Sequence, residues 1–202
     1  MSERERLIFA TGNAHKMVEI RAILGDLYDV VSMKEAGISA DIVEDGKSFE
    51  ENALIKARAV AKLAGCMAMA DDSGLEVDYL GKMPGIYSAR FLGENTDYDI
   101  KNRVIIDMVA KAPAAERTAR FVCAIACAWP DGREKVMRGT FEGEIAKEQA
   151  GPNGFGYDPI FYVPEYDMTS AEMTPEQKNA VSHRGNALRM MRAILQKETE
   201  SV

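Results

Sequence analysis

The chain has 202 residues, enough for one domain with a buried core, and its 47% hydrophobic and 28% charged residues are typical of a globular enzyme. Its net charge of −7 disfavours general binding to nucleic acid or to an anionic membrane, so we expect neither as a partner. A site for a polyanion would have to be built locally, from a few basic residues, helix N-termini and a metal.

The first part of the chain alternates predicted strands and helices. Residues 7–11 form a short apolar run typical of a buried strand, and residues 28–33 form a second one. Between them Met17, Ile20 and Leu24 recur at helical spacing, and Gly25 follows where a helix end favours glycine. This strand–helix–strand order is typical of a mixed α/β fold.

The next predicted elements are a helix and a strand. Ser48 and Glu51 have the spacing of a capping box, which predicts a helix that runs to residue 63 or 64. Residues 66–70 then form another apolar run, which we interpret as a buried strand. The polar sequence Asp71-Asp72-Ser73-Gly74 is expected at the end of that strand.

The second half of the chain continues the mixed pattern. Thr96 or Asp97 is placed to cap a helix that runs to about residue 111. Residues 117–129 and 133–145 predict two long strands of a hairpin, joined by Pro130-Asp131-Gly132. Ser182 is expected to cap a last helix with a buried face of Leu188, Met191, Ile194 and Leu195. Repeats and long linkers are absent from the sequence, so we interpret residues 1–202 as a single domain.

The cysteines and the N-terminus bear on the compartment. Cys66, Cys123 and Cys127 lie in apolar runs without Cys-x-x-Cys spacing, which predicts reduced core thiols. The charged N-terminus is unlike a signal peptide, and the sequence holds no apolar stretch of about 18 residues. We therefore expect a cytoplasmic location.

The first candidate site is Thr11-Gly12-Asn13-Ala14-His15-Lys16, between a predicted strand and a predicted helix. Gly12 allows the backbone to approach a ligand closely, and the helix N-terminus offers N–H groups that suit phosphate. Lys16 in the first turn opposes the helix dipole unless an anion lies nearby. The alternative is an ordinary strand-to-helix turn with a solvated lysine, paired to Glu19. The hexapeptide does not match a Walker A loop.

The second candidate site is the adjacent pair Asp71 and Asp72. Two neighbouring carboxylates at a strand end repel each other unless a cation compensates, and Mg²⁺ prefers such oxygen ligands. Glu44, in the acidic segment 41–45, is a candidate for a further metal ligand. The alternative is an exposed acidic turn. We set aside an aspartic protease, because Asp-Ser-Gly occurs only once and lacks the all-β surroundings of such enzymes.

The third candidate site is Gly154-Phe155-Gly156-Tyr157-Asp158-Pro159. Glycines beside two aromatic residues predict a shaped loop whose rings could stack on a planar group such as a purine. The alternative is a packed turn whose aromatic rings belong to the core.

The fourth candidate site is Lys178 followed by Ser182-His183-Arg184 at the start of the last helix. Cationic residues are disfavoured at a helix N-terminus, which suggests a ligand there. The alternatives are a neutral, hydrogen-bonded His183 and a surface Arg184. The sequence shows no histidine–cysteine pattern typical of zinc.

Taken together, these segments closely resemble the inosine triphosphate pyrophosphatase family. The matching positions are Thr11-Gly12-Asn13-x-x-Lys16, Ser48-Phe49-x-Glu51-Asn52-Ala53 with Lys56-Ala57-Arg58, Ala70 to Leu75 with Val77-Asp78, Pro84-Gly85-x-Tyr87-Ser88-Ala89-Arg90, Gly154 to Pro159 with Phe161, and Lys178 with Ser182-His183-Arg184-x-x-Ala187-Leu188. They follow the order of the family along nearly the whole chain. Residues 111–138 match only as scaffold.

The resemblance implies an α/β fold with an elongated mixed sheet flanked by helices, two lobes around a central active-site cleft, and a homodimer. It implies Mg²⁺-dependent hydrolysis of the purine nucleoside triphosphates ITP, dITP and XTP to the monophosphate and pyrophosphate. Residues 11–16 would hold the triphosphate, Asp72 would be the metal-linked proton acceptor with Glu44 also near the metal, and Ser73 would touch substrate. The nucleotide, largely its base, would contact Phe155, Gly156, Tyr157, Asp158, Lys178, His183 and Arg184.

Two rival functions remain open at this point. The related septum-associated nucleotide pyrophosphatases share fold and reaction but act on pyrimidine and modified nucleotides, and the intact Ser182-His183-Arg184 argues against them. The other rival is a regulatory protein that binds a nucleotide without hydrolysing it. The acidic pair Asp71 and Asp72 argues for catalysis instead.

Overall fold

The computed structural model describes residues 4–11 and 13–199, with only the backbone described for residues 14, 15, 198 and 199. The chain divides into two compact units. Unit 1 consists of Met1–Asp72, Cys123–Gly139 and Arg184–Val202, and unit 2 consists of Ser73–Val122 and Thr140–His183. Each unit is therefore assembled from segments that lie far apart in the sequence.

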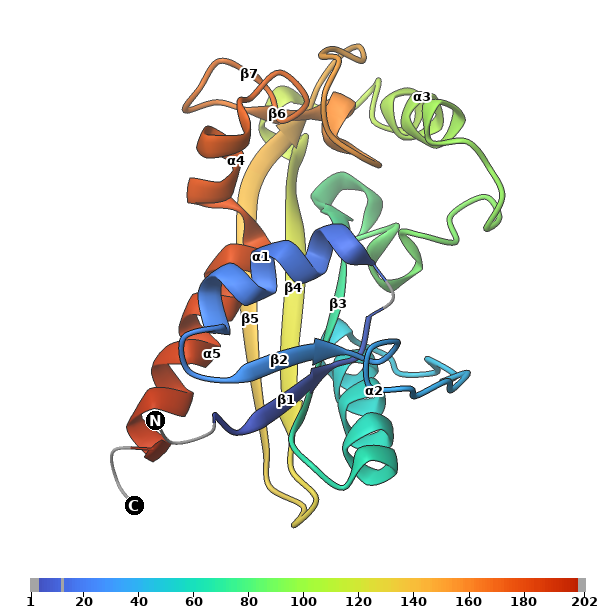
Figure 1. Cartoon of the computed structure of the whole chain (residues 1–202). Coiled ribbons are helices and arrows are strands. Elements are labelled where there is room, and N and C mark those ends of the chain that lie inside the picture. Colours follow the sequence, from blue (N-terminus) through green and yellow to red (C-terminus); the bar gives the residue numbers. More distant parts are fainter. Residues whose placement is uncertain (1–3, 12, 200–202) are drawn as a thin grey trace. The chain divides into compact units, whose positions relative to one another are not determined.

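Seven strands form a mixed sheet in the order β2-β1-β3-β4-β5-β6-β7 (Figure 1). Strand β1 pairs in parallel with β2 and β3, whereas β6 is antiparallel to both β5 and β7. The strands are β1 (Arg6–Phe9), β2 (Asp29–Ser32), β3 (Ala68–Val77), β4 (Thr118–Ala128), β5 (Glu134–Ile145), β6 (Phe161–Val163) and β7 (Met168–Thr169). Strands β3, β4 and β5 contribute residues to both units.

Five α-helices accompany the strands in the described part of the chain. They are α1 (Ala14–Leu24), α2 (Phe49–Ala64), α3 (Tyr98–Met108), α4 (Pro175–Val181) and α5 (His183–Thr199). This confirms the predicted mixed α/β class, in which helices flank the sheet. Among the described helices, none combines the length and apolarity that a membrane crossing needs.

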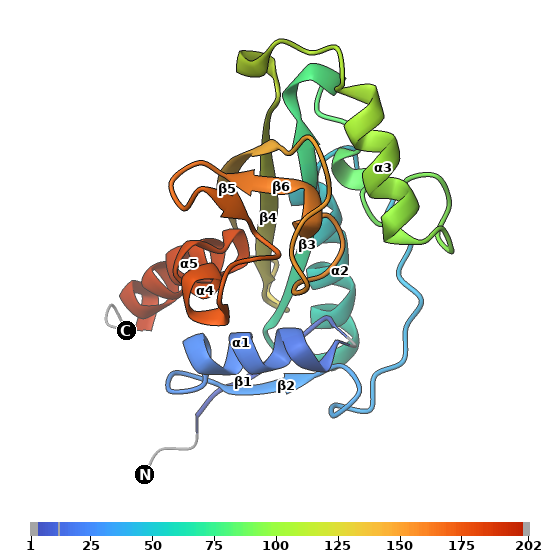
Figure 2. The ribbon, with the colours of Figure 1, turned by 90° about the horizontal axis from the view of Figure 1, so that it is seen from above.

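Unit 1 has its own hydrophobic core. Helix α1 packs against β2 and helix α2 against β1, and α1 runs alongside both strands in Figure 2. Leu7, Ile20, Met69, Ile125 and Leu188, from five different elements, are fully buried in this core. Burying a side chain of this size contributes about 1.5–3 kcal/mol to folding. The core therefore fixes the strands and the helix starts that carry the polar residues of unit 1.

Unit 2 has a second core around aromatic rings. The Phe161 ring lies with its centroid 4.4 Å from that of Phe121 and 5.1 Å from that of Phe141. Tyr157 and Ile160 are buried in the same core, and their side chains hold the loop that precedes β6 against it.

Helix α2 begins and ends as its sequence predicts. The Ser48 hydroxyl accepts a hydrogen bond from the backbone N–H of Glu51 at 3.1 Å. Gly65 ends the helix in the left-handed conformation, with φ at 64°. The capping box is only half correct, because the Glu51 carboxylate accepts from the N–H of Lys47 at 2.6 Å and not from that of Ser48.

Several sequence expectations are wrong in detail. Strand β3 does not end before Asp71 but runs through the acidic pair to Val77, because backbone pairing in a sheet does not require apolar side chains. Cys66 is half-buried, whereas Cys123 and Cys127 are fully buried as expected. The short helix α4, capped by Thr174 and Gln177, was not predicted.

Candidate functional site

Asp71 lies in the middle of β3 and is buried in unit 1 against two cations. Its residue is 3% exposed, and its Oδ2 lies 2.8 Å from the Lys16 ammonium nitrogen and 3.3 Å from Nε of Arg184. Arg184 also lies 3.5 Å from a Glu19 carboxylate oxygen. A buried carboxylate is costly unless it is paired, so Asp71 needs both cations.

The electrostatic balance at Asp71 favours the charged form. Burial by itself raises the pKa of this carboxyl, but the charges of Lys16 and Arg184 outweigh burial and lower the pKa to about 2. Burial by itself lowers the pKa of Arg184, but its acidic neighbours, chiefly Asp71, together outweigh burial and raise that pKa. Asp71 and Arg184 are therefore both charged near neutral pH.

Asp72 follows Asp71 in the same strand, where successive side chains point to opposite faces. Its Oδ2 accepts a hydrogen bond at 3.0 Å from the side-chain amide of Asn52, a residue of α2 that is 1% exposed. The two carboxylates thus have different partners. The expectation that the pair lies at a strand end is wrong, because β3 continues beyond both residues to Val77. A compensating metal at the pair stays a prediction.

Glu44 is held by the same helix that carries Asn52. Its Oε2 lies 2.8 Å from the ammonium of Lys56, one helical turn after Asn52. Glu44 and Lys56 also line a cavity of about 620 Å³ in unit 1, together with Thr11 and several residues between Met33 and Ile42. Within the described residues, no group of three or more histidine, cysteine or acidic side chains is placed to hold a metal.

The segment from Thr11 to Lys16 forms the start of α1. The Thr11 hydroxyl accepts from the N–H of Asn13 at 3.1 Å, and the Asn13 side-chain oxygen accepts from the N–H of Lys16 at 3.3 Å. Gly12 lies outside the described residues, and the side chains of Ala14 and His15 are not described. Lys16 is paired with Asp71, so the alternative of a lysine paired to Glu19 is wrong.

In unit 2 the loop formed by residues 154–159 carries two aromatic rings, one exposed and one buried. Phe155 is 77% exposed, whereas Tyr157 is 3% exposed and donates its hydroxyl to the backbone oxygen of Ser88 at 2.7 Å. Tyr98 lies between them, with its ring centroid 5.1 Å from that of Phe155 and 5.2 Å from that of Tyr157. Only Phe155 of the two is placed to stack on a ligand.

Asp158 ties this loop together and holds Lys178. Its carboxylate accepts from the N–H of Phe155 at 2.6 Å, from the Ser170 hydroxyl at 2.7 Å and from the Lys178 ammonium at 2.5 Å. Gly154 has a φ of 90°, and a side chain there would come within 2.5 Å of this carboxylate. The loop conformation therefore depends on both residues.

His183 and Ser73 also belong to unit 2. The His183 ring stacks on Phe121, with centroids 5.3 Å apart and an interplanar angle of 21°. Ser73 follows Asp72 in β3 and is half-buried. A role of these residues toward substrate stays a prediction.

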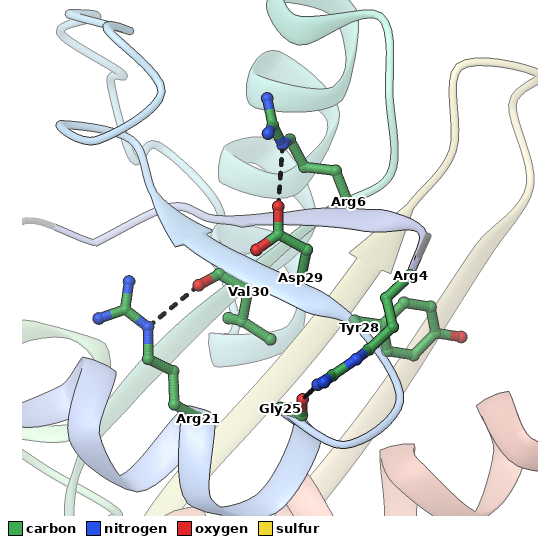
Figure 3. Close-up of a pocket in the computed structure, with 7 residues that line it drawn as sticks. All are labelled: Arg4, Arg6, Arg21, Gly25, Tyr28, Asp29 and Val30. Atoms are coloured by element: carbon green, nitrogen blue, oxygen red, sulfur yellow. Dashed lines mark hydrogen bonds and ion pairs between the residues drawn. The ribbon is translucent and has the colours of Figure 1, made fainter. Parts of the chain in front are cut away.

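A larger cavity in unit 1, of about 990 Å³, gathers none of the predicted site residues (Figure 3). Its arginines are engaged locally: Arg6 pairs with Asp29 at 3.3 Å, Arg21 donates to the Val30 carbonyl at 3.0 Å, and Arg4 donates to the Gly25 carbonyl. These contacts join β1 to β2, α1 to β2, and the residue that follows α1 to the segment before β1.

A model described as the Ham1 family matches residues 7–194 of the chain. The chain belongs to the Ham1 family. It is 47% identical over 191 residues to a dITP/XTP pyrophosphatase of Exiguobacterium sibiricum, which covers 94% of this chain and 96% of that protein.

Solved structures agree with the family membership. The Ham1 protein of Staphylococcus aureus matches with a TM-score of 0.89 and 42% identity. The match covers 96% of this chain and 100% of the Staphylococcus aureus chain. A nucleoside-triphosphatase / dITP/XTP pyrophosphatase of Mycobacterium abscessus matches with a TM-score of 0.80 and 42% identity, covering 92% and 98% of the two chains. The resemblance read from the motifs is confirmed.

Sequence reasoning assigned no role to Asn52 or Lys56. Both lie in one of the segments shared with the family, and their i,i+4 spacing puts them on one face of the Ham1 chain's helix α2. That spacing is the one feature of the sequence that could have singled out the two residues. It does not show which residues this face of α2 contacts.

Proposed function

We propose that the chain hydrolyses the non-standard purine nucleoside triphosphates ITP, dITP and XTP to the monophosphate and pyrophosphate, and so removes them from the nucleotide pool. The observation that carries the proposal is the group formed by Lys16, Asp71 and Arg184 at the start of α1, with Asp72 next in the strand. Relatives named dITP/XTP pyrophosphatase at 45–47% identity support the substrate class.

The triphosphate is bound by the segment from Thr11 to Lys16, comprising Thr11, Gly12, Asn13, Ala14, His15 and Lys16. A helix N-terminus presents backbone N–H groups and a positive dipole end, which favour phosphate oxygens. The Lys16 ammonium lies beside that terminus because Asp71 holds it there. A phosphate group adds a second anion to a cation that is already positioned.

Asp72 is the catalytic residue, and it accepts the proton of the water that attacks the α-phosphorus. With Glu44 it also supplies the carboxylate oxygens that Mg²⁺ prefers, and the donor chemistry of this pair fits that ion. When bound, Mg²⁺ would neutralise charge on the phosphate oxygens. Asn52 and Lys56 hold the two carboxylates in the absence of the metal.

The base is bound by Phe155, Gly156, Tyr157 and Asp158, with Ser73, Lys178, His183 and Arg184 as further contacts. The exposed Phe155 ring can stack on a purine. Inosine and xanthine carry a C6 oxygen that accepts hydrogen bonds, and Arg184 has donors only. Adenine carries an amino group at that position, which would face donors without an acceptor.

The remaining expectations are also proposals. We infer one functional domain over residues 1–202, a homodimer, a cytoplasmic location and no nucleic-acid or membrane partner. The repeated passage of the chain between the two units supports a single domain. The acidic net charge of −7 supports the absence of a nucleic-acid partner.

A panel of nucleoside triphosphates with Mg²⁺ tests the function, with pyrophosphate and monophosphate measured together. We expect one pyrophosphate for each monophosphate, fastest with ITP, dITP or XTP. Preference for pyrimidine nucleotides would favour the septum-associated relatives. Binding without turnover would favour a regulatory protein.

A further inference from the structure

Asn52 makes two hydrogen bonds that join two separate parts of unit 1. Its Nδ2 donates to Oδ2 of Asp72 at 3.0 Å, and its Oδ1 accepts from the backbone N–H of Gly46 at 2.9 Å. The orientation of the amide follows from its partners, because a carboxylate cannot donate and a backbone N–H cannot accept. At 1% exposure, Asn52 makes these bonds out of contact with water.

Gly46 is fitted closely against Asn52. A Cβ on Gly46 would lie 2.7 Å from the Asn52 side-chain oxygen and 2.9 Å from its backbone nitrogen. Such distances are too short for a real side chain, so the segment before α2 can approach the helix this closely only with glycine here. Glu44 lies two residues before Gly46, so the same contact sets where its backbone runs.

Lys56 completes the arrangement from the same helix. It lies four residues after Asn52, on the same helix face, and its ammonium pairs with the Glu44 carboxylate at 2.8 Å. One face of α2 therefore holds Asp72 through Asn52, the backbone of residues 44–46 through Asn52, and the Glu44 side chain through Lys56.

We propose that Asn52 is a positioning residue for the reaction: it orients the Asp72 carboxylate and fixes the 44–46 segment relative to it. This inference rests on the proposed roles of Asp72 and Glu44. Groups that orient metal-ligating carboxylates commonly change metal affinity or activity by about 10–100-fold when they are removed. Asn52 would act through Asp72 and would not itself contact the substrate.

The test compares Asn52→Ala and Asn52→Asp with Ser48→Ala. Ser48 caps the same helix and its loss destabilises α2, but it does not touch Asp72, so it reports a purely structural effect. Asn52→Asp keeps the shape and the acceptor for Gly46 but replaces the donor that faces Asp72. Each full-length variant is assayed for kcat and KM with ITP over a range of Mg²⁺ concentrations. Binding of Mn²⁺ without nucleotide is measured by electron paramagnetic resonance.

We expect both Asn52 variants to lose about 10–100-fold in kcat or in Mn²⁺ affinity, with KM for ITP within about threefold of the wild type. Ser48→Ala should lower Tm and leave kcat and Mn²⁺ affinity unchanged. The double variant Asn52→Ala with Asp72→Asn should lose no more activity than Asp72→Asn alone, because Asn52 acts through that carboxylate.

The inference is overturned if Asn52→Ala behaves like Ser48→Ala, with a lower Tm but unchanged kcat and Mn²⁺ affinity. If Asn52→Ala does not fold, the isosteric Asn52→Asp decides alone: normal kcat and Mn²⁺ affinity would overturn the inference. Failure of the proposed function looks different. In that case the wild type releases no pyrophosphate from ITP, or Asp72→Asn retains full activity.

Discussion

The Lys16 ammonium lies 2.8 Å from the buried carboxylate of Asp71, and this contact joins the start of α1 to the middle of β3. A lysine in the first turn of a helix is electrostatically unfavourable by itself. Here the carboxylate reverses that balance.

Lys16→Ala should lower both stability and triphosphate affinity. Removing the ammonium leaves Asp71 with Arg184 as its remaining charged partner, at a cost of about 1–3 kcal/mol in the free energy of unfolding. KM for ITP should rise. Thermal melting without ligand and steady-state kinetics measure the two effects, with the exposed Lys62→Ala as the control. An unchanged Tm would show that Asp71 does not depend on Lys16.

Asp72→Asn should keep the fold and remove most turnover. The substitution preserves shape, and an Asn side-chain oxygen at this position can still accept from Asn52. Loss of a general base typically costs ~10²–10⁴-fold in kcat. Pyrophosphate release measures the loss, and Asp45→Asn, in the exposed part of the same acidic segment, is the control. Near-normal activity of Asp72→Asn at saturating Mg²⁺ would remove Asp72 from its catalytic role.

Chelation of divalent metal should stop turnover without unfolding the protein. Asp72 and Glu44 have Asn52 and Lys56 as partners in the absence of a metal, so stability should not depend on the ion. We expect pyrophosphate release to vanish in excess chelator and to return with added Mg²⁺, while Tm without nucleotide stays constant. Full activity in chelator would rule out the metal-dependent reaction.

Arg184→Ala should reduce the preference for ITP over ATP. A donor-only guanidinium matches the C6 oxygen of inosine, and each mismatched buried polar group costs roughly 1–3 kcal/mol, or about 10-fold per 1.4 kcal/mol. The ratio of kcat/KM for the two substrates should therefore fall about 10-fold or more. Lys16→Ala, which acts on the phosphates, should change both substrates by the same factor. The same result for Arg184→Ala would assign Arg184 to phosphate binding or to support of Asp71.

Acid should destabilise unit 2 through Asp78. Its carboxylate accepts two hydrogen bonds from the Arg120 guanidinium, at 2.9 and 3.0 Å, and one from Thr118 at 2.6 Å. The Arg120 hydrogen bonds, with smaller contributions from Lys82 and Thr118, hold the pKa of Asp78 well below its usual range. The other charged groups at this point are Glu76 and Glu142, which lie against Arg120.

Because the pKa of Asp78 is lower in the folded than in the unfolded state, its contribution to stability is complete above about pH 5 and is lost as pH falls through about 4 and below. Asp78→Asn should therefore flatten the acid side of the curve of unfolding free energy against pH. Urea unfolding from pH 3 to 7 measures this curve, with the exposed Asp107→Asn as the control. Parallel curves for wild type and Asp78→Asn would contradict the prediction.

The sequence by itself determined the α/β class, the helix that Ser48 caps, the hairpin around Pro130-Asp131-Gly132 and the family. These features depend on local periodicity, capping and short motifs, which are all properties of neighbouring residues. The end of β3 was misjudged because the apolar pattern stops at Asp71, whereas strand pairing continues to Val77.

The tertiary structure alone decided which partner each carboxylate of the adjacent pair receives. Alternation along β3 sends Asp71 to Lys16 and Arg184, and Asp72 to Asn52, and these partners are 55, 113 and 20 residues away in the chain. Spacing along a sequence describes only residues on one element. The packing of separate elements brings such distant side chains within hydrogen-bonding distance, and so decides which of two identical carboxylates is neutralised by cations and which is held by a neutral amide.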